Sequence, residues 1–176
     1  MHDETGEKMT PESCHIYIAI DRKRDNPNNT NKIAIRQIIS NPETDIEIIK
    51  HKCKLLHPDK TFRIYRTVNK RSYAKAFKQF QHRLIEDPNI TKIDSLWKTC
   101  LLNPKSKAER KFLIDIDSKT EYNPVEEWLK YHNIIIYESS FTPNGYHLIT
   151  DPFDSREFNF PNTEIKKDAL LFIRMA

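Results

Sequence analysis

Glycine is almost absent from this chain, and its absence limits the nucleotide-binding architectures that the chain can adopt. The 176 residues include only two glycines, Gly6 and Gly145. The P-loop and the dinucleotide fingerprint both need several glycines within a few residues, because the backbone there must approach the phosphates closely. The sequence therefore excludes both of these glycine-rich phosphate loops.

Length and polarity indicate one globular domain. A chain of 176 residues can bury a hydrophobic core without the help of disulfide bonds or structural metals. Its composition, with 38% hydrophobic and 31% charged residues, is polar but does not indicate disorder. The cysteines, Cys14, Cys53 and Cys100, show neither zinc-ribbon nor disulfide spacing, which favours a reducing compartment. No apolar run approaches the ~20 residues that span a bilayer. The sequence predicts an intracellular, cytoplasmic protein without membrane contact, and a disordered N-terminus over residues 1–12.

Positive charge is concentrated in the first half of the chain. Between Lys50 and Arg83 the only acidic residue is Asp59, among many lysines and arginines, although the net charge of the whole chain is only +4. A local basic field of this kind suggests an anionic partner. The alternative is a solvated helix face.

Hydrophobic spacing predicts the elements of the first half. Alternating isoleucines predict a strand, and apolar residues three or four apart predict amphipathic helices. Ser72 is expected to cap a helix whose apolar face includes Phe77 and Phe80. The expected elements are a strand at 15–20, a loop at 21–31, a helix at 43–56, a strand at 61–68, a helix after Ser72 and a helix at 91–102.

The second half gives a clearer pattern. Pro143-Asn144-Gly145 is turn chemistry, and Asn123 followed by Pro124 predicts a helix start. The expected elements are a buried strand at 111–117, a helix from Asn123 to about His132, strands at 133–138 and 146–150, and a last strand or hairpin at 164–175. The prediction is a single α/β (α+β) domain over residues 13–176, with a small mixed or antiparallel sheet flanked by helices. Residues 13–105 would form its basic half and residues 106–176 its metal and nucleotide half.

Two carboxylates follow the buried strand. Asp115 and Asp117 are two residues apart, so a strand would point both side chains to one face. Repulsion between them would raise the pKa of each, and a divalent cation such as Mg²⁺ or Mn²⁺ would remove that cost. An ordinary strand-to-helix loop, where Asp is common, is the competing interpretation, because this motif alone is weak.

A histidine follows the predicted turn. Gly145 permits a positive φ or a close backbone approach, and His147 comes two residues later. A histidine at such a place can donate to a phosphate oxygen or act as an acid or base. Taken alone, it could equally face solvent from a hairpin.

These residues resemble the first two motifs of the archaeo-eukaryotic primase superfamily. The family pattern is a hydrophobic run leading into Asp-x-Asp, here Lys111 to Asp117, and then small-x-His, here Gly145-Tyr146-His147. The resemblance covers about forty residues closely. It implies that Asp115 and Asp117 bind catalytic metals and that His147 contacts the phosphates of an incoming nucleotide.

The resemblance also implies a third acidic ligand. Asp168 has the expected order in the chain, whereas Phe153-Asp154 fits the two-residue pattern better but follows the histidine closely. Asp168 is the preferred prediction. The nucleotide-binding set implied beside His147 and Gly145 comprises Ser139, Lys166 and Lys167. The two lysines could instead be a solvated strand edge.

The predicted function is template-dependent nucleotidyl transfer, making primers or extending DNA by a two-metal mechanism. The expected partners are a single-stranded template, nucleoside triphosphates and, as a candidate, a helicase or other replication protein; small chains of this kind are typical of viruses and mobile elements. The alternatives are a catalytically reduced nucleic-acid- or nucleotide-binding module and a metal-dependent nuclease. The expected nucleic-acid contacts, interleaved with aromatic residues, are Arg63, Arg66, Lys70 and Arg71.

Overall fold

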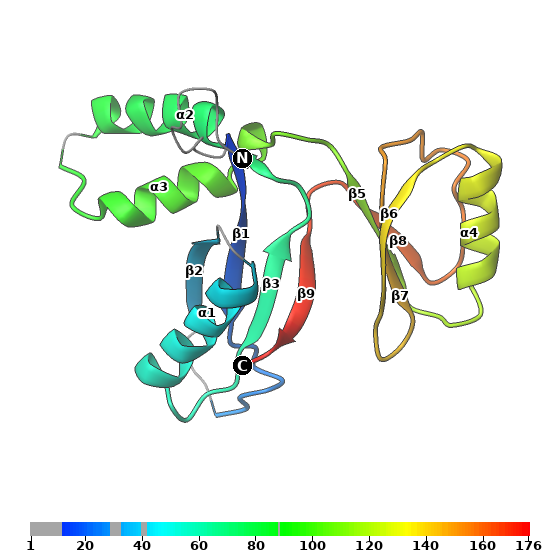
Figure 1. The fold of residues 1–176 in the computed structure, drawn as a ribbon, viewed down its shortest axis with the longest axis horizontal. Helices are drawn as coiled ribbons and strands as arrows, with labels where there is room; N and C mark the ends of the chain where they lie inside the picture. Colours follow the sequence, from blue (N-terminus) through cyan, green and yellow to red (C-terminus); the bar gives the residue numbers. More distant parts are fainter. Residues whose placement is uncertain (1–11, 29–32, 40–41, 88) are drawn as a thin grey trace, which may run out of the picture.

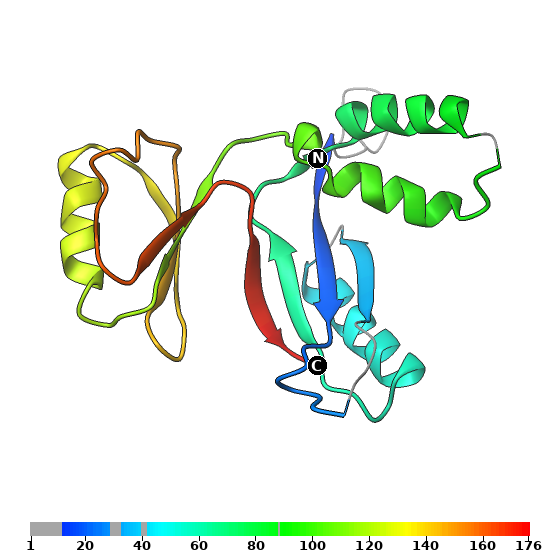
Figure 2. The ribbon, with the colours of Figure 1, turned by 180° about the vertical axis from the view of Figure 1, so that it is seen from behind.

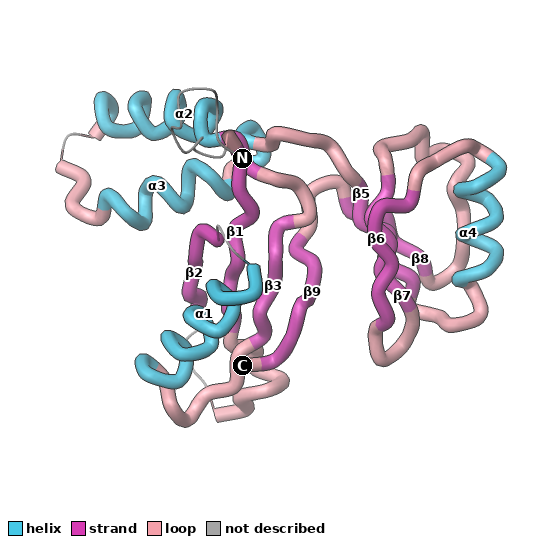
Figure 3. The backbone as a smooth tube through the Cα atoms, viewed as in Figure 1, coloured by secondary structure: helices cyan, strands magenta, loops and turns pink. Residues whose placement is uncertain are grey.

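The computed structural model describes residues 12–28, 33–39, 42–87 and 89–176. The expected N-terminal tail, apart from Glu12, and the end of the loop predicted at 21–31 lie outside these ranges. The described chain folds into two small antiparallel sheets with helices packed against them, which confirms the α+β class (Figures 1 and 3). The strands divide between two sheets, where the sequence suggested one.

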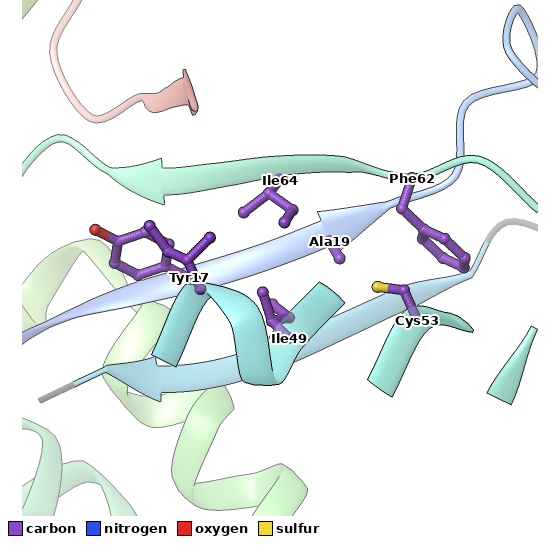
Figure 4. Packing of buried hydrophobic residues seen from close by; sticks show 7 residues of the cluster. Tyr17, Ala19, Ile49, Cys53, Phe62 and Ile64 are labelled. Atoms are coloured by element: carbon purple, nitrogen blue, oxygen red, sulfur yellow. The ribbon is translucent and has the colours of Figure 1, made fainter. Parts of the chain in front are cut away.

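The first sheet has β1 at its centre. Both faces of β1 are buried, because Ile16 and Ile18 lie in one hydrophobic cluster and Tyr17 and Ala19 in another. The strands run in the order β2 (Ala34–Ile39), β1 (Ser13–Ile20), β3 (Arg63–Thr67) and β9 (Leu170–Met175), and the short β4 (Arg71–Ser72) pairs with the start of β1. Helix α1 (Pro42–Leu56) covers the face formed by Tyr17, Ala19 and Ile64 (Figure 4).

A helical hairpin packs against the other face of β1. Helix α2 (Tyr73–Glu86) starts after Ser72, whose side chain accepts a hydrogen bond from Lys75 N at 3.3 Å, as expected of an N-cap. Helix α3 (Ile93–Leu102) follows, and the 3₁₀ turn η1 (Pro104–Ser106) ends the hairpin. Phe77, expected on the apolar face of α2, is 51% exposed.

The second sheet has one covered face and one polar face. Its order is β6 (Ile136–Phe141), β7 (Tyr146–Thr150), β5 (Phe112–Ile116) and β8 (Thr163–Lys166). Ile114, Ile116 and Leu148 pack against helix α4 (Tyr122–Tyr131), which lies on the side away from the first sheet (Figure 2). Alternate residues of the same strands therefore face the first sheet.

The second sheet is an insertion between two parts of the first. The chain enters it through residues 107–111 and leaves through residues 167–169, after which β9 pairs with β3. The sequence predicted one strand or a hairpin at residues 164–175. The hairpin is wrong, because β8 pairs with β5 in the second sheet and β9 pairs with β3 in the first. Buried Asn69 holds both connections: it exchanges hydrogen bonds with the backbone of Lys111 (2.6 and 3.2 Å), and its Nδ2 donates to Lys167 O (3.4 Å).

Three local expectations need correction. Strand β2 was not expected. Strand β6 starts at Ile136, later than predicted, because Asn133 has a φ of 55° and Ile134 N donates to Leu129 O at the end of α4. Helix α4 begins at Tyr122, so Asn123 lies in its first turn and does not cap it.

Other features concern the chain as a whole. Cys14, Cys53 and Cys100 are free thiols, and all three are buried. Within the described ranges, no helix is both long and apolar enough to cross a bilayer.

Candidate functional site

A cleft of about 700 Å³ opens between the two sheets. The second sheet contributes the side chains that the sequence singled out: Asp115, Asp117, His147 and Lys166 all line it. At one end the two sheets meet through a small hydrophobic cluster. Val68 and Leu171 come from the side of the first sheet, and they pack against Leu113 and Ile149 of the second sheet. The cleft is therefore bounded by packed core, and its polar side chains have defined positions.

Asp115 and His147 are brought together by strand register. They lie directly opposite each other on β5 and β7, and His147 Nε2 is 3.1 Å from Asp115 Oδ1. Lys166 Nζ donates to Asp115 Oδ2 at 2.6 Å. The hydrogen bond from His147 and the pair with Lys166 together lower the pKa of Asp115 from 3.8 to about 2, against the effect of its burial. Asp115 is thus an ionised carboxylate with a cationic neighbour on one oxygen.

Asp117 lies just beyond the end of β5. Its side chain is exposed in the cleft, while its backbone N donates to Asn162 O at 2.8 Å. The backbone bond fixes the chain without engaging the carboxylate. Asp115 and Asp117 consequently share one cleft, and the second of them is open to solvent.

Gly145 is required by a close approach. A Cβ at this position would overlap the carbonyl oxygen of Ile116 and lie 2.9 Å from Ser118 N, and these are the two residues on either side of Asp117. The turn is closed by Gly145 N donating to Thr142 Oγ1 and by Thr142 N donating to Gly145 O, both at 2.9 Å. The glycine therefore lets the β6–β7 turn sit against the Asp-x-Asp segment.

The structure does not bring Asp168 into the cleft. Asp115 lies opposite Glu164, and Asp168 is four residues further along the chain, on the order of 13 Å for extended backbone. There its carboxylate pairs with Arg71 at 2.8 and 3.2 Å. Asp154, the other candidate, pairs with Arg156 and lines a different pocket. Neither acid is positioned as a third ligand.

Two further predicted nucleotide contacts face elsewhere. Ser139 is opposite Leu148, on the side of the second sheet that α4 covers, and lines a separate pocket there. Its neighbour Ser140 is the residue opposite His147. The Nζ atom of Lys167 lies 5.8 Å from the ring centre of Phe112, and the side chain does not line the cleft. Ser139 is one residue away from the position on β6 that faces His147, and Lys167 is one residue past the end of β8, so neither shares the face of Asp115.

The predicted nucleic-acid contacts are mostly engaged inside the protein. Arg71 is only 3% exposed, so it cannot contact an external backbone. Arg66 pairs with Glu138 of the second sheet at 2.7 Å. Arg63 makes a two-pronged pair with Asp25, at 2.6 and 2.7 Å, and lines the cleft. Lys70 is exposed.

Several cleft residues were not singled out from the sequence. Arg22 and Arg24 come from the loop after β1 and line the wall opposite Asp115. Glu164 does not line the cleft but lies next to it, opposite Asp115, where it pairs with Lys166 at 3.1 Å and is 70% exposed. The alternation of Glu164 and Lys166 along one strand was the available signal, because it places both on one face.

The donor set fits a cation bound together with a phosphate ligand. Among the described residues, no group of three or more His, Cys, Asp and Glu side chains could hold a metal ion. Mg²⁺, however, is usually held by one or two carboxylates, with waters and substrate phosphates completing its shell. Asp115 and Asp117 fit one such ion. They do not supply the ligands of two.

Comparison with known proteins adds no relative. No protein-family model matches the chain, and searches of curated proteins and of solved structures find no significant match.

Proposed function

We propose that this chain binds a nucleoside triphosphate with Mg²⁺ or Mn²⁺ in the cleft and uses it in template-dependent nucleotidyl transfer. The observation that supports this most is the register of β5 and β7. It sets His147 against Asp115 beside a turn that only glycine fits, with Asp117 in the same cleft. These are the residues on which the resemblance to the primase superfamily rests.

The charges of the cleft suit a triphosphate. Arg22, Arg24 and Arg63 line its wall on the first-sheet side, and Lys166 lies beside Asp115 on the other. Arg63 is already paired with Asp25 through Nε and Nη2, so Arg22 and Arg24 are the arginines of this wall better placed to meet a phosphate. A volume of about 700 Å³ is within the range of small-molecule sites.

An aromatic pair borders the same cleft. Tyr65 and Phe172 meet edge to face at a centroid distance of 5.8 Å, and the guanidinium of Arg22 lies 5.2 Å from the Tyr65 ring centre. Tyr65 is only 6% exposed, so Phe172 is the ring of this pair that could stack a base while cations hold the phosphates. The cleft therefore offers surfaces for both parts of a nucleotide.

The cation would be held by Asp115 and Asp117, with phosphate oxygens and water as its other ligands. When bound, it would neutralise phosphate charge and polarise the reacting phosphoryl group. His147 Nε2 already donates to Asp115 Oδ1, so His147 would donate to a phosphate oxygen either through Nδ1 or after giving up that bond. The ammonium of Lys166 occupies the other oxygen of Asp115, so the incoming cation must share or displace these contacts.

Metal binding is the first test. Calorimetric titration of Mn²⁺ with a nucleoside triphosphate should show binding that is lost in the Asp115→Asn, Asp117→Asn double variant. Asp154→Asn is the matched control, since that acid is exposed and lies outside the cleft. Equal binding by the double variant and the wild type would remove this site from consideration.

Catalysis is tested by incorporation of labelled nucleotide on a single-stranded template. Wild type should incorporate label with Mg²⁺ or Mn²⁺, and the double variant should not. His147→Ala should mainly weaken triphosphate binding, because one charge-assisted contact contributes about 1.5–3 kcal/mol.

A second candidate is a binding module without catalysis. It is favoured by Asp168, which pairs with Arg71 and leaves the cleft without the third acid that the resemblance implies. Wild type that binds triphosphate but incorporates none with either metal would support this module. Shortening of the template in the same assay would instead support the nuclease.

A further inference from the structure

A second basic surface lies outside the cleft, where α2, η1 and the connection to β5 meet. It is a small groove of about 260 Å³. Its cationic lining residues are Lys75, Lys105, Lys107 and Arg110, and the only acid among its lining residues is Glu109. None of these residues lines the cleft between the sheets. The groove is therefore a separate site with an excess of positive charge.

The positive charge of the groove is not neutralised by nearby carboxylates. Glu109 is itself engaged, because it accepts from Lys70 N at 3.1 Å and pairs with Lys111 Nζ at 3.1 Å. In the part of the chain that the structure describes, no carboxylate forms an ion pair with the four cationic lining residues. An anionic ligand would meet cations that have no internal partner of this kind.

Arginines of the basic run in the first half behave differently. Arg63, Arg66 and Arg71 each pair with an acid, Asp25, Glu138 and Asp168 respectively. Their charges contribute to holding the protein together. Of the side chains in that run, Lys75 is the one that lines the groove.

The backbone of the groove is fixed in advance. Buried Ser106 donates to Cys100 O and accepts from Gln79 Nε2, both at 2.7 Å. Lys75 Nζ donates to Lys107 O at 2.7 Å, and the Asn103 side chain accepts from Lys105 N at 2.9 Å. Because these bonds hold the loop, a ligand would not have to order it on binding.

We propose that this groove binds the sugar-phosphate backbone of a nucleic-acid strand, as a contact surface separate from the nucleotide cleft. Four cations around a narrow groove match a chain of phosphates, and backbone contacts of this kind position a strand without reading its sequence. The choice of nucleic acid among polyanions rests on the proposed function. The existence of an anion site in the groove does not.

The test reverses two exposed charges of the groove. The variant is Lys105→Glu, Arg110→Glu, and the matched control is Lys54→Glu, Lys92→Glu, which makes the same charge change at exposed positions on α1 and before α3. Fluorescence anisotropy with a single-stranded oligonucleotide reports affinity. Loss of two phosphate contacts should weaken binding by more than about tenfold at 0.1 M salt and lower the salt slope by about 1.4. The control should change affinity less than about threefold.

Further variants and measurements distinguish a failure of the groove proposal from a failure to fold or a failure of the proposed function. The milder Lys105→Gln, Arg110→Gln variant replaces the first if charge reversal prevents folding, and it should show the same slope change. Binding of Mn²⁺ and triphosphate in the cleft should be unchanged by either variant. If the Asp115→Asn, Asp117→Asn variant still binds the oligonucleotide, the groove proposal is supported even where no nucleotidyl transfer is observed.

Two results would overturn the proposal. The first is an equal loss of affinity in the groove variant and in the control variant. That result would mean that the net charge of the protein, and not the groove, determines the affinity. The second is competition by inorganic phosphate or polyphosphate as strong as by the oligonucleotide at equal phosphate concentration. That result would leave a general anion site in place of a nucleic-acid site.

Discussion

The two sheets use polar residues in opposite ways. In the first sheet, Arg71 and Arg66 are paired with acids that lie beyond its edge, and His15 Nδ1 donates to the Thr67 carbonyl oxygen. In the second sheet, the polar face lines a cleft, and the side chain of Asp117 is exposed within it. Charge in the first sheet joins parts of the protein, whereas charge in the second lines an open cleft.

This difference shows why density of charge is a weaker guide to function than register. The basic run of the first half was the more prominent feature of the sequence, yet its arginines are largely consumed by internal pairs. The Asp-x-Asp motif and the histidine are only three side chains, and strand pairing collects them in one cleft. Three variants test the comparison.

The largest effect is expected from Arg71→Ala. Its guanidinium is 3% exposed and pairs with Asp168, so truncation leaves a partly buried carboxylate without its partner. The free energy of unfolding should fall by about 3–5 kcal/mol, measured by urea denaturation. Arg66→Ala is the control, because its pair with Glu138 is more exposed and should contribute about 1 kcal/mol or less. If Arg71→Ala is as stable as the wild type but no longer binds the oligonucleotide, Arg71 contacts nucleic acid, as the sequence predicted.

Acid should destabilise the first sheet through His15. Burial, followed by the charge of Arg66, lowers the pKa of His15 from 6.5 to about 4. Between these values the unfolded chain binds the proton and the folded chain does not, so stability is complete above about pH 6.5 and declines as the pH falls towards 4. The decline should reach about 3 kcal/mol.

The His15 prediction is checked by unfolding curves across this pH range. His15→Gln should remove most of the slope, whereas His82→Gln, at a side chain that is 74% exposed, should leave it unchanged. A wild-type curve that is flat from pH 7 to 4 would contradict the assigned burial of His15.

The smallest effect concerns the open face of the second sheet. Lys166→Met removes the ammonium that competes with a cation for Asp115, so Mn²⁺ affinity should rise by about fivefold, equivalent to about 1 kcal/mol. Lys167→Met is the control, since its ammonium lies over the ring of Phe112 and outside the cleft. Weaker Mn²⁺ binding after Lys166→Met would indicate that the lysine assists the cation site instead of competing with it.

Local patterns predicted the elements well but not their partners. Alternation and turn chemistry gave β7 with its observed bounds and β1 nearly so, and apolar spacing gave α1 and α2. The failures are non-local. Strands β8 and β9 lie close together in the sequence, and only their pairing with β5 and β3 assigns them to different sheets.

The candidate site shows the same limit. Asp115, Asp117 and His147 were found because a strand and a turn fix them locally. The prediction of Asp168 depended on the position of a remote segment relative to β5, and Ser139 depended on register, where a shift of one residue reverses the face. The clamp of Asn69 on both connections had no sequence signal, because most of its partners are backbone groups.

The insertion of one sheet within the other has a consequence for synthesis on the ribosome. Strand β3 pairs with β9, more than one hundred residues later, so β3 keeps an unpaired edge while the whole second sheet emerges. Domains tend to fold as they are made, and an unpaired strand edge invites association with other chains. Nascent chains that have emerged from the ribosome as far as Lys166, but not yet as far as Leu170, should therefore contain a completed second sheet beside an aggregation-prone first one, and depend most on chaperones at that stage.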